Sequence, residues 1–229
     1  MRTLAIGDIH GMSGALDALM DAVAPTADDV LVFLGDYVDR GPDSKGVLDR
    51  LIAWSQKYQM VCLRGNHELM MMAARDGRDD LRMWLSVGGA EALASYGTAG
   101  RATLADVPEE HWTFLEERCG DYFETDTHIF VHANLHPGVE LADQPDSMLF
   151  WEFLNNPINH KSGKVVICGH TSQKSGEPLV WKSTVCIDTY AYGGGWLTGL
   201  DVGTRTYWQA DARGQVRTGK LAIPSEPHA

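Results

Sequence analysis

Apolar residues in the first part of the chain alternate between short continuous runs and helical repeats. Continuous runs over 4–6, 30–34 and 60–63 are typical of strands that are buried on both faces. Between these runs, apolar residues recur every three or four positions over 14–23 and 44–57, which predicts two amphipathic helices. The alternation of strand and helix indicates a parallel sheet, so the predicted fold class is α/β.

The apolar pattern changes after the third run. From Glu68 to about Phe123, apolar residues recur at helical rather than strand spacing. This spacing predicts a helical insertion, or cap, beside the sheet over about 68–123. The cap begins with three methionines at 70–72, which we interpret as core packing because methionine fills irregular gaps well.

The last part of the chain returns to strand-like runs. Three such runs end at His132, Cys168 and Ile187. A hairpin is expected from Trp196 to Gln209, with its turn at 201–204. The final stretch, 225–229, is expected to be frayed. We find no repeat or linker, so the sequence predicts a single domain over 1–229.

Composition and charge narrow the classes of protein. The chain has 229 residues, 44% of them hydrophobic and 22% charged, as in an ordinary soluble globular domain. Its formal net charge is −12, which argues against nucleic acid or an anionic membrane as a partner, because both attract basic surfaces. Two bound divalent ions would offset about four of these charges.

Cysteines and terminal segments indicate a reducing compartment. The four cysteines form no C-x-x-C pair and three lie in strand-like runs, so we interpret them as reduced, buried thiols. The first apolar stretch is too short for a signal peptide and runs straight into Asp8. No apolar run approaches membrane-spanning length. We therefore expect a cytoplasmic enzyme.

Acid, amide and imidazole side chains directly follow five of the strand-like runs. Three motifs and two later histidines carry them: Gly7-Asp8-Ile9-His10-Gly11, Gly35-Asp36-Tyr37-Val38-Asp39-Arg40-Gly41, Gly65-Asn66-His67-Glu68, His132 and His170. Ligands bind at the carboxyl ends of strands in open α/β sheets. A strand end also holds a side chain rigidly, as a metal site requires.

These side chains suit a pair of divalent ions about 3.5–4 Å apart, which can hold a phosphate and a hydroxide for in-line displacement. Asp36 is the natural bridging carboxylate, because it follows the central run. Asp8 and His10 are two residues apart, so on an extended segment they would point the same way and share one ion. The other ion would be completed by Asn66, His132 and His170.

His67 is the candidate general acid. It follows Asn66 directly, so on an extended segment it would point elsewhere and remain free to protonate a leaving alkoxide. Asp39 is the expected carboxylate partner of this histidine. Arg40 offers a planar fork for phosphate oxygens.

Each motif alone also has a purely structural interpretation. Asp39 and Arg40 could form a surface ion pair worth less than about 1 kcal/mol, and His132 could be a core histidine. All such interpretations would have to hold together, each at the end of a buried strand, so we favour the metal site. The remaining histidines are interpreted as structural or exposed: His111, His128, His136, His160 and His228.

The motifs G-D-x-H-G, G-D-x-V-D-R-G and G-N-H-E, in this order, resemble those of the phosphoprotein phosphatase superfamily of calcineurin-like metallophosphoesterases. The chain looks most similar to the compact bacterial and phage serine/threonine-type enzymes and to their diadenosine-tetraphosphatase relatives. The resemblance extends from Leu4 to about Gln209. It implies a β-sandwich flanked by helices, and so adds a second sheet that periodicity does not show.

The resemblance also implies roles for individual residues. One ion would be held by Asp8, His10 and Asp36. The other ion would be held by Asp36, Asn66, His132 and His170. His67 would be the acid, oriented by Asp39, and Arg40 and Asn66 would bind the substrate's phosphate. Manganese is the usual ion in bacterial relatives, with iron and zinc as alternatives.

The chain departs from this family pattern at two places. Trp151 is followed by Glu152-Phe153, where many bacterial relatives have Trp-x-Arg and so a second phosphate clamp. Asn134 follows His132-Ala133, where relatives often have His-Ala-Gly. We therefore expect catalysis as in the family, with phosphate affinity and substrate choice of its own.

The expected function is hydrolysis of phosphomonoesters by attack of a metal-bridging hydroxide, on protein phosphoserine, phosphothreonine or phosphotyrosine or on a small phosphoester. One alternative is a dinucleoside-polyphosphate hydrolase, which would share every ligand and differ only in its pocket. Another is a non-catalytic phospho-binding module on the same fold. His67 and Asp39 weigh against the last, because binding alone needs no acid.

Overall fold

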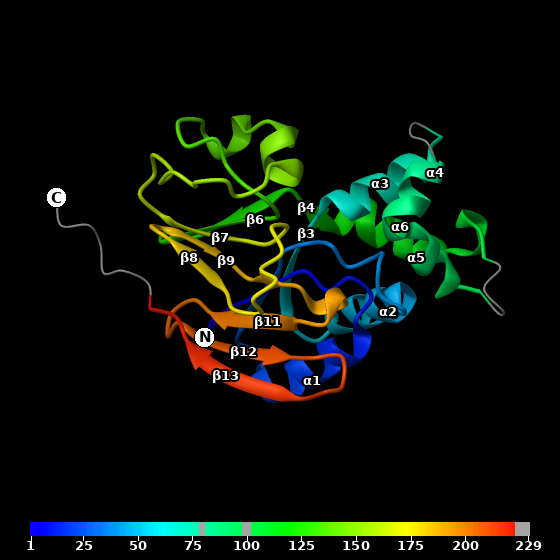
Figure 1. Cartoon of the computed structure of the whole chain (residues 1–229), viewed down its shortest axis with the longest axis horizontal. Helices are drawn as coiled ribbons and strands as arrows, with labels where there is room; N and C mark the ends of the chain where they lie inside the picture. Colours follow the sequence, from blue (N-terminus) through cyan, green and yellow to red (C-terminus); the bar gives the residue numbers. More distant parts are fainter. Residues whose placement is uncertain (78–80, 98–101, 223–229) are drawn as a thin grey trace.

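Two β-sheets pack against each other at the centre of the molecule (Figure 1). The computed structural model describes residues 1–77, 81–97 and 102–222. The eight-stranded sheet has the order β13-β12-β11-β1-β2-β3-β4, with β10 paired to β11, and the five-stranded sheet has the order β5-β6-β7-β9-β8. The strands of the eight-stranded sheet are β1 (Thr3–Ile6), β2 (Val30–Phe33), β3 (Gln59–Leu63), β4 (Cys119–Gly120), β10 (Asp188–Thr189), β11 (Trp196–Asp201), β12 (Thr206–Ala210) and β13 (Val216–Lys220). Those of the five-stranded sheet are β5 (Tyr122–Glu124), β6 (His128–Val131), β7 (Val165–Cys168), β8 (Leu179–Trp181) and β9 (Thr184–Cys186).

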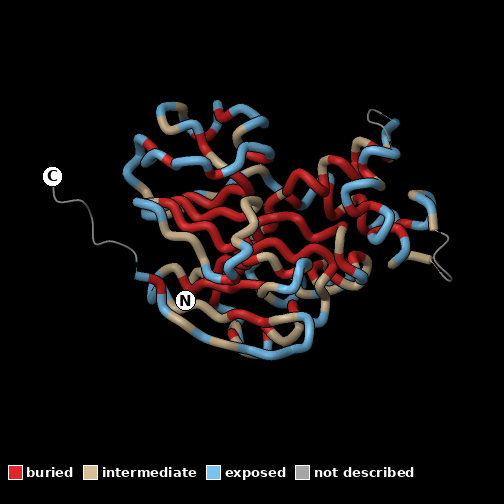
Figure 2. The backbone as a smooth tube through the Cα atoms, viewed as in Figure 1, coloured by how far each residue is buried: buried red, intermediate tan, exposed pale blue. Residues whose placement is uncertain are grey.

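Strands β1 and β2 are apolar on both faces because both faces are covered. Leu4 and Phe33 pack with the helices on the outer face of the eight-stranded sheet. Ala5 and Val32 point the other way, into the layer between the two sheets. Figure 2 shows the resulting band of buried strands across the centre of the molecule. The two sheets with flanking helices confirm the predicted fold class and the implied sandwich.

Strands β1, β2 and β3 are parallel neighbours, and helices connect them. Thr3 pairs with Val30 across β1 and β2, and Val30 pairs with Gln59 across β2 and β3. The connecting helices are α1 (Ser13–Val23) and α2 (Ser44–Trp54). A parallel sheet of this kind brings the carboxyl ends of the three strands to one edge. Helix α2 ends at Trp54 rather than at Lys57, so its predicted end was three residues too late.

The cap is helical, but its boundaries differ from the prediction. It comprises α3 (Asn66–Arg75), α4 (Leu81–Trp84), a segment kinked at Gly88 (Leu85–Gly89), α5 (Ala90–Ala94), a 3₁₀ turn (Leu104–Asp106), α6 (Glu109–Thr113) and the π-helical turn η4 (Phe114–Arg118). Helical structure therefore begins at Asn66 and ends at Arg118, since Cys119 and Tyr122 already belong to the two sheets. The three methionines at 70–72 are buried, which confirms that they pack in the core.

The carboxyl-terminal part contains the predicted hairpin and one further strand. Strands β11 and β12 pair antiparallel, with Leu197 opposite Ala210. Strand β13 extends this sheet as an edge strand, and its mostly polar sequence explains why the apolar pattern did not predict it. The predicted frayed stretch, 225–229, lies outside the described residues. In the described part of the chain, no helix has the length and apolarity needed to cross a membrane.

Candidate functional site

The candidate residues follow five strands directly, as predicted. In the eight-stranded sheet, Asp8 follows β1, Asp36 follows β2 and Asn66 follows β3. In the five-stranded sheet, His132 follows β6 and His170 follows β7. Contacts join the two sheets at this edge. The Nδ1 atom of His132 donates to the Leu34 carbonyl at 2.8 Å, and the backbone N–H of His170 donates to Asp8 Oδ2 at 2.9 Å. Two distant parts of the sequence therefore meet in one site.

Two sets of three side chains could each hold an ion, and they share Asp36. In the His10 group, comprising His10, Asp36 and His67, the possible ligand atoms all lie within 4.8 Å of one another. The same limit holds for the His170 group, comprising Asp36, His132 and His170. Four of these five side chains are buried, and His170 is partly buried. A carboxylate common to both groups is the arrangement that a bridging ligand requires.

The histidine ring nitrogens that face the site carry lone pairs. His10 and His132 donate their Nδ1–H to the carbonyls of Val38 and Leu34, and His170 donates its Nε2–H to the carbonyl of Trp151 at 3.1 Å. A carbonyl can only accept, so the other nitrogen of each ring is an acceptor when the ring is neutral. Such bonds to backbone carbonyls are typical of metal-ligating histidines.

Acceptor atoms therefore converge without a proton between them. His132 Nε2 and His170 Nδ1 each lie 3.0 Å from Asn66 Oδ1, and His132 Nε2 lies 3.5 Å from Asp36 Oδ1. Burial outweighs the charge of Asp36 and lowers the pKa of His170 to about 4 and that of His10 to about 3, which favours the neutral rings. Neutral acceptors at this spacing repel one another unless a cation lies between them. The donor set fits a metal ion.

Asp8 adds a further free acceptor. Among the described residues, its Oδ1 is the one buried side-chain oxygen or nitrogen with no hydrogen-bond partner. An unsatisfied buried carboxylate oxygen is costly and fits a ligand position. A Cβ at Gly169 would lie 1.9 Å from this oxygen, so only glycine leaves room for it. Burial, together with repulsion from Asp188 and Asp36, raises the pKa of Asp8 well above its ordinary value.

The segment that carries Asp8 and His10 is not extended, contrary to our expectation. His10 has a φ of 46°, in the left-handed region. Asp8 belongs to neither three-residue group, and the sharing of one ion by Asp8 and His10 stays a prediction. Among the described residues, ten non-glycine residues have positive φ, and five of them are candidate site residues: His10, Asp36, Asp39, Arg40 and His170. Backbone strain of this kind is concentrated at functional sites.

His67 is held by a carboxylate, as predicted. Its Nδ1 lies 2.6 Å from Asp39 Oδ2, and both side chains are buried. The indole N–H of Trp84, from the cap, donates to the same oxygen at 2.9 Å. Burial lowers the pKa of His67, but the charge of Asp36 and the bond to Asp39 outweigh it, so the pKa is raised. The pKa of His67 is therefore shifted in the opposite direction to the pKa of His10, His132 and His170, as a general acid requires.

The conformation of the His67 segment differs from the extended one that we assumed. Gly65 is the N-cap of α3, so Asn66 and His67 are already helical. Consecutive residues of a helix point about 100° apart. The expectation that the two side chains point in different directions is therefore met by a helix rather than by a strand.

Arg40 lies beside the His10 group. Its Nη1 is 3.1 Å from His10 Nε2, and its guanidinium lies 4.5 Å from the ring centroid of Tyr192. The backbone N–H of Arg40 donates to the carbonyl of Gly88 in the cap at 3.1 Å. Gly88 has a φ of 126°, and a Cβ there would lie 2.6 Å from Arg40 N, so this approach requires glycine. Asp39 is paired with His67 and buried, which excludes the surface ion pair considered above.

Sequence reasoning missed Glu68, Trp84 and Tyr192. Both carboxylate oxygens of Glu68 accept from backbone N–H groups, at 2.8 Å from Asp36, 2.8 Å from Tyr37 and 3.2 Å from Val38. Burial and repulsion from Asp36 raise the pKa of Glu68 to about 7. An acid directly after Asn66-His67 was the available signal. For the roles of Trp84 and Tyr192 there was none, because their partners lie far away in the sequence.

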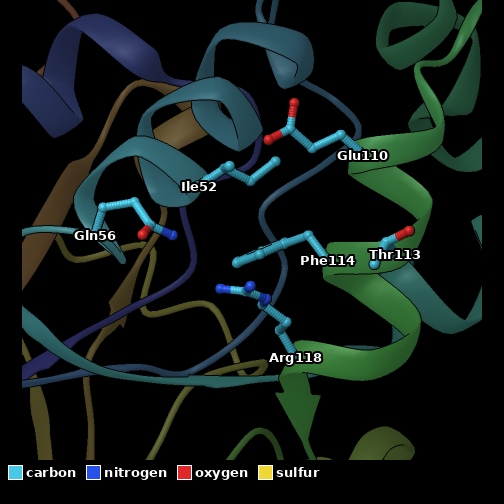
Figure 3. A pocket seen from close by; sticks show the side chains of 6 residues that line it. All are labelled: Ile52, Gln56, Glu110, Thr113, Phe114 and Arg118. Carbon is cyan, nitrogen blue, oxygen red and sulfur yellow. The ribbon is translucent and has the colours of Figure 1, made fainter.

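A separate cavity lies away from these residues. It has a volume of about 250 Å³ and lies between α2 and the α6–η4 segment (Figure 3). Its lining comprises Ile52, Gln56, Glu110, Thr113, Phe114 and Arg118. None of the candidate site residues lines it, so we do not assign the chemistry to this cavity.

Comparison with known proteins agrees with this geometry. A serine/threonine-protein phosphatase 1 of Salmonella typhimurium is 32% identical over 151 residues, which cover 64% of this chain and 61% of that protein. A symmetrical bis(5'-nucleosyl)-tetraphosphatase of Burkholderia pseudomallei is 30% identical over 147 residues, covering 62% of this chain and 47% of that protein. The alignments thus span less than two thirds of either relative.

Solved structures share the fold over nearly the whole chain. A protein assigned as a diadenosine tetraphosphatase has a TM-score of 0.67 and 20% identity, covering 96% of this chain and 93% of that one. A cold-active protein tyrosine phosphatase has a TM-score of 0.62 and 14% identity, covering 95% and 78%. The family model for calcineurin-like phosphoesterases matches residues 1–174. The chain therefore belongs to the calcineurin-like phosphoesterase family.

Proposed function

We propose that this phosphoesterase is a bimetallic phosphatase of protein phosphomonoesters, acting on phosphoserine and phosphothreonine and also on phosphotyrosine. The observation that carries the proposal is the buried 2.6 Å contact between His67 and Asp39 beside the shared carboxylate of Asp36. A phosphomonoester with an alkyl leaving group needs a proton donor next to the reacting phosphate. A binding module would have no use for such a pair.

The chain's ligands would hold two divalent ions, which the family resemblance implies to be manganese, with iron or zinc as alternatives. His10 and Asp8 would serve one ion, Asn66, His132 and His170 the other, and Asp36 both. Bound divalent ions would activate a water molecule as the nucleophile and polarise the phosphoryl group. Arg40 would bind phosphate oxygens through its guanidinium fork, with the Asn66 amide as a second contact.

His67 would deliver a proton to the leaving oxygen. Asp39 accepts from Nδ1, so the proton to be donated sits on Nε2 of the same ring. The bond from Trp84 keeps the carboxylate in place, and the carboxylate in turn orients the ring. This arrangement supports general acid catalysis by a residue that is not itself a ligand.

Hydrolysis of a dinucleoside polyphosphate is the main competing function. Such a substrate needs cations along its phosphate chain. Among the described residues of the cap, Arg75 is bound by Glu109 and Glu116 at 2.9 Å each, so its charge is already matched. Arg78 lies outside the described residues. The pairing of Arg75 favours a protein substrate over a polyphosphate.

The test is a substrate panel on metal-stripped, manganese-reconstituted protein. We expect kcat/KM for phosphoserine, phosphothreonine and phosphotyrosine peptides to exceed that for diadenosine tetraphosphate. Chelation should abolish all of these activities, and manganese should restore them. The reverse ranking, by tenfold or more, would make the polyphosphate the better substrate. Tight binding of phosphopeptides without turnover would identify a binding module instead.

A further inference from the structure

The exposed ring of Phe153 and the backbone of Trp151 border the His170 group. The ring of Phe153 stacks on the ring of His170, with centroids 4.8 Å apart and planes inclined by 25°. Phe153 is 55% exposed and Trp151 is 43% exposed, whereas the neighbouring Phe150 and Leu154 are buried. Exposed aromatic rings beside a site of converging polar groups are typical of ligand-binding surfaces.

The segment that carries these rings is fixed to the loops of the site. The carbonyl of Trp151 accepts from His170 Nε2 at 3.1 Å, and the carbonyl of Phe153 accepts from Asn134 Nδ2 at 3.4 Å. The backbone N–H of Leu154 donates to Thr171 Oγ1 at 3.0 Å. The loops that carry the candidate ligands therefore also fix the Phe153 backbone. The Phe153 ring is thus in position before a substrate binds.

The contact with His170 limits what Phe153 can touch in a substrate. The His170 ring on which Phe153 stacks also contacts another candidate ligand, since His170 Nδ1 lies 3.0 Å from Asn66 Oδ1. A group that packs on Phe153 must therefore be joined to the reacting phosphate by few atoms. The phenyl ring of phosphotyrosine is bonded directly to the ester oxygen. In a dinucleoside polyphosphate, ribose separates each base from the phosphate chain.

The charge of the segment also favours phosphotyrosine over a dinucleoside polyphosphate. Glu152 lies between the two aromatic residues and is exposed. A carboxylate on this segment adds negative charge near the site, which disfavours a polyphosphate more than a monoester. A neutral ring is compatible with it, and ring edges carry a partial positive charge.

We propose that Phe153 forms an aromatic platform that binds the phenyl ring of a phosphotyrosine substrate and favours aryl over alkyl phosphomonoesters. The proposal rests on the proposed phosphatase function, because it assigns a substrate preference to that same site. Offset or edge-to-face packing of two aromatic rings corresponds to about a 2- to 12-fold preference. We expect this preference mainly in KM, since the platform holds the ring before and during the reaction.

The experiment compares Phe153→Ala and Phe153→Leu with Trp181→Ala in the manganese-loaded full chain. Trp181 is a matched control, because it is 42% exposed and lies on β8 at the edge of the second sheet. Peptides of one sequence carry either phosphotyrosine or phosphoserine. The ratio of their kcat/KM values should fall about 2- to 12-fold in Phe153→Ala, less in Phe153→Leu, and not in Trp181→Ala. An unchanged ratio in Phe153→Ala would overturn the platform.

Calorimetric binding of phenylphosphonate and methylphosphonate separates the platform from the proposed function. The wild-type protein should bind phenylphosphonate more tightly, and Phe153→Ala should lose that preference while keeping affinity for methylphosphonate. Equal affinities in the wild type would overturn the platform whatever the protein hydrolyses. A retained phenyl preference in a protein that turns over only diadenosine tetraphosphate would refute the protein-phosphatase function and the phosphotyrosine assignment together.

Discussion

The His10 group and the His170 group share Asp36 but have different surroundings. His10 is enclosed by His67 and Tyr192, whose rings lie edge-on to it at 4.8 Å each, and by the guanidinium of Arg40. His170 is covered on one side by the half-exposed ring of Phe153. The enclosed group has the candidate proton donor and the cation, whereas the open group has apolar surface. The comparison suggests that chemistry and substrate choice are divided between the two.

The connections between strands explain this division. The His10 group is built from loops after three adjacent parallel strands, and Glu68 fixes these loops through their backbone N–H groups. The His170 group belongs to the second sheet, where the chain between β6 and β7 runs from 132 to 164 and contains the Trp151 segment. A long connection can vary without disturbing the ligands at the strand ends.

The largest effect is expected from the residue common to both groups. Asp36→Asn should lower kcat by more than about 100-fold, because even partners that only orient a metal ligand are worth about 10–100-fold. Elemental analysis should show fewer manganese ions per chain than in the wild type. Asp17→Asn is the control, since this carboxylate pairs with Arg50 at the surface. If Asp36→Asn keeps two ions and normal turnover, Asp36 is not the ligand that the two groups share.

The next effect concerns the acid of the enclosed group. His67→Asn should lower kcat by about 10²–10⁴-fold on phosphoserine peptides. The loss should be much smaller on an activated aryl phosphate, whose leaving group needs no proton. Steady-state kinetics on both substrates measure the difference. If kcat falls equally on both substrates, His67 acts as a metal ligand instead of an acid. Its place in the His10 group also allows that role.

Arg40→Ala tests the cation of the enclosed group. A hydrogen bond to a charged group is worth about 1.5–3 kcal/mol, so kcat/KM should fall by at least about tenfold. Inhibition by free phosphate should weaken in parallel, which a general loss of stability would not produce. If Arg40→Ala leaves kcat/KM nearly unchanged, another cation binds the phosphate, and the arginines of the cap become the candidates.

The smallest effect should come from the contact between the cap and the acid. Trp84→Phe keeps the buried ring but removes the N–H that donates to Asp39. This bond supports the carboxylate without touching the substrate, so only part of its worth of about 1.5–3 kcal/mol should reach the transition state, and we expect a loss of about 10-fold or less in kcat on phosphoserine peptides. Asp39→Asn should cost more, because it removes the partner of His67 itself. A loss in Trp84→Phe as large as in Asp39→Asn would show that the cap does more than support the carboxylate.

The strand ends and their order could be predicted because burial on both faces leaves a continuous apolar signature. The runs that end before Asp8, Asp36 and His170 are the strands of the structure within one or two residues. The polar residues after them could be assigned because strand ends of a parallel sheet meet. Edge strand β13 has no such signature, since only one side of it is paired and its residues are largely polar.

Local backbone conformation was the part that the pattern could not show. The left-handed conformation of His10 and the helical start at Asn66 depend on Gly65 and on contacts across the sheet, not on spacing along the chain. The partners of Asp39 and Arg40 in the cap lie 45 or more residues away. Trp84 and Tyr192 could therefore be recognised only once the chain was folded.

The wide separation of the candidate ligands along the chain, from Asp8 to His170, couples metal binding to folding. An unfolded chain holds these side chains far apart, so an ion that binds the folded site shifts the folding equilibrium by mass action. At a free concentration 100 times its dissociation constant, one such ion stabilises the native state by about 2.7 kcal/mol. Metal supply would then set the melting temperature, and with it the lifetime of the protein, as well as its activity.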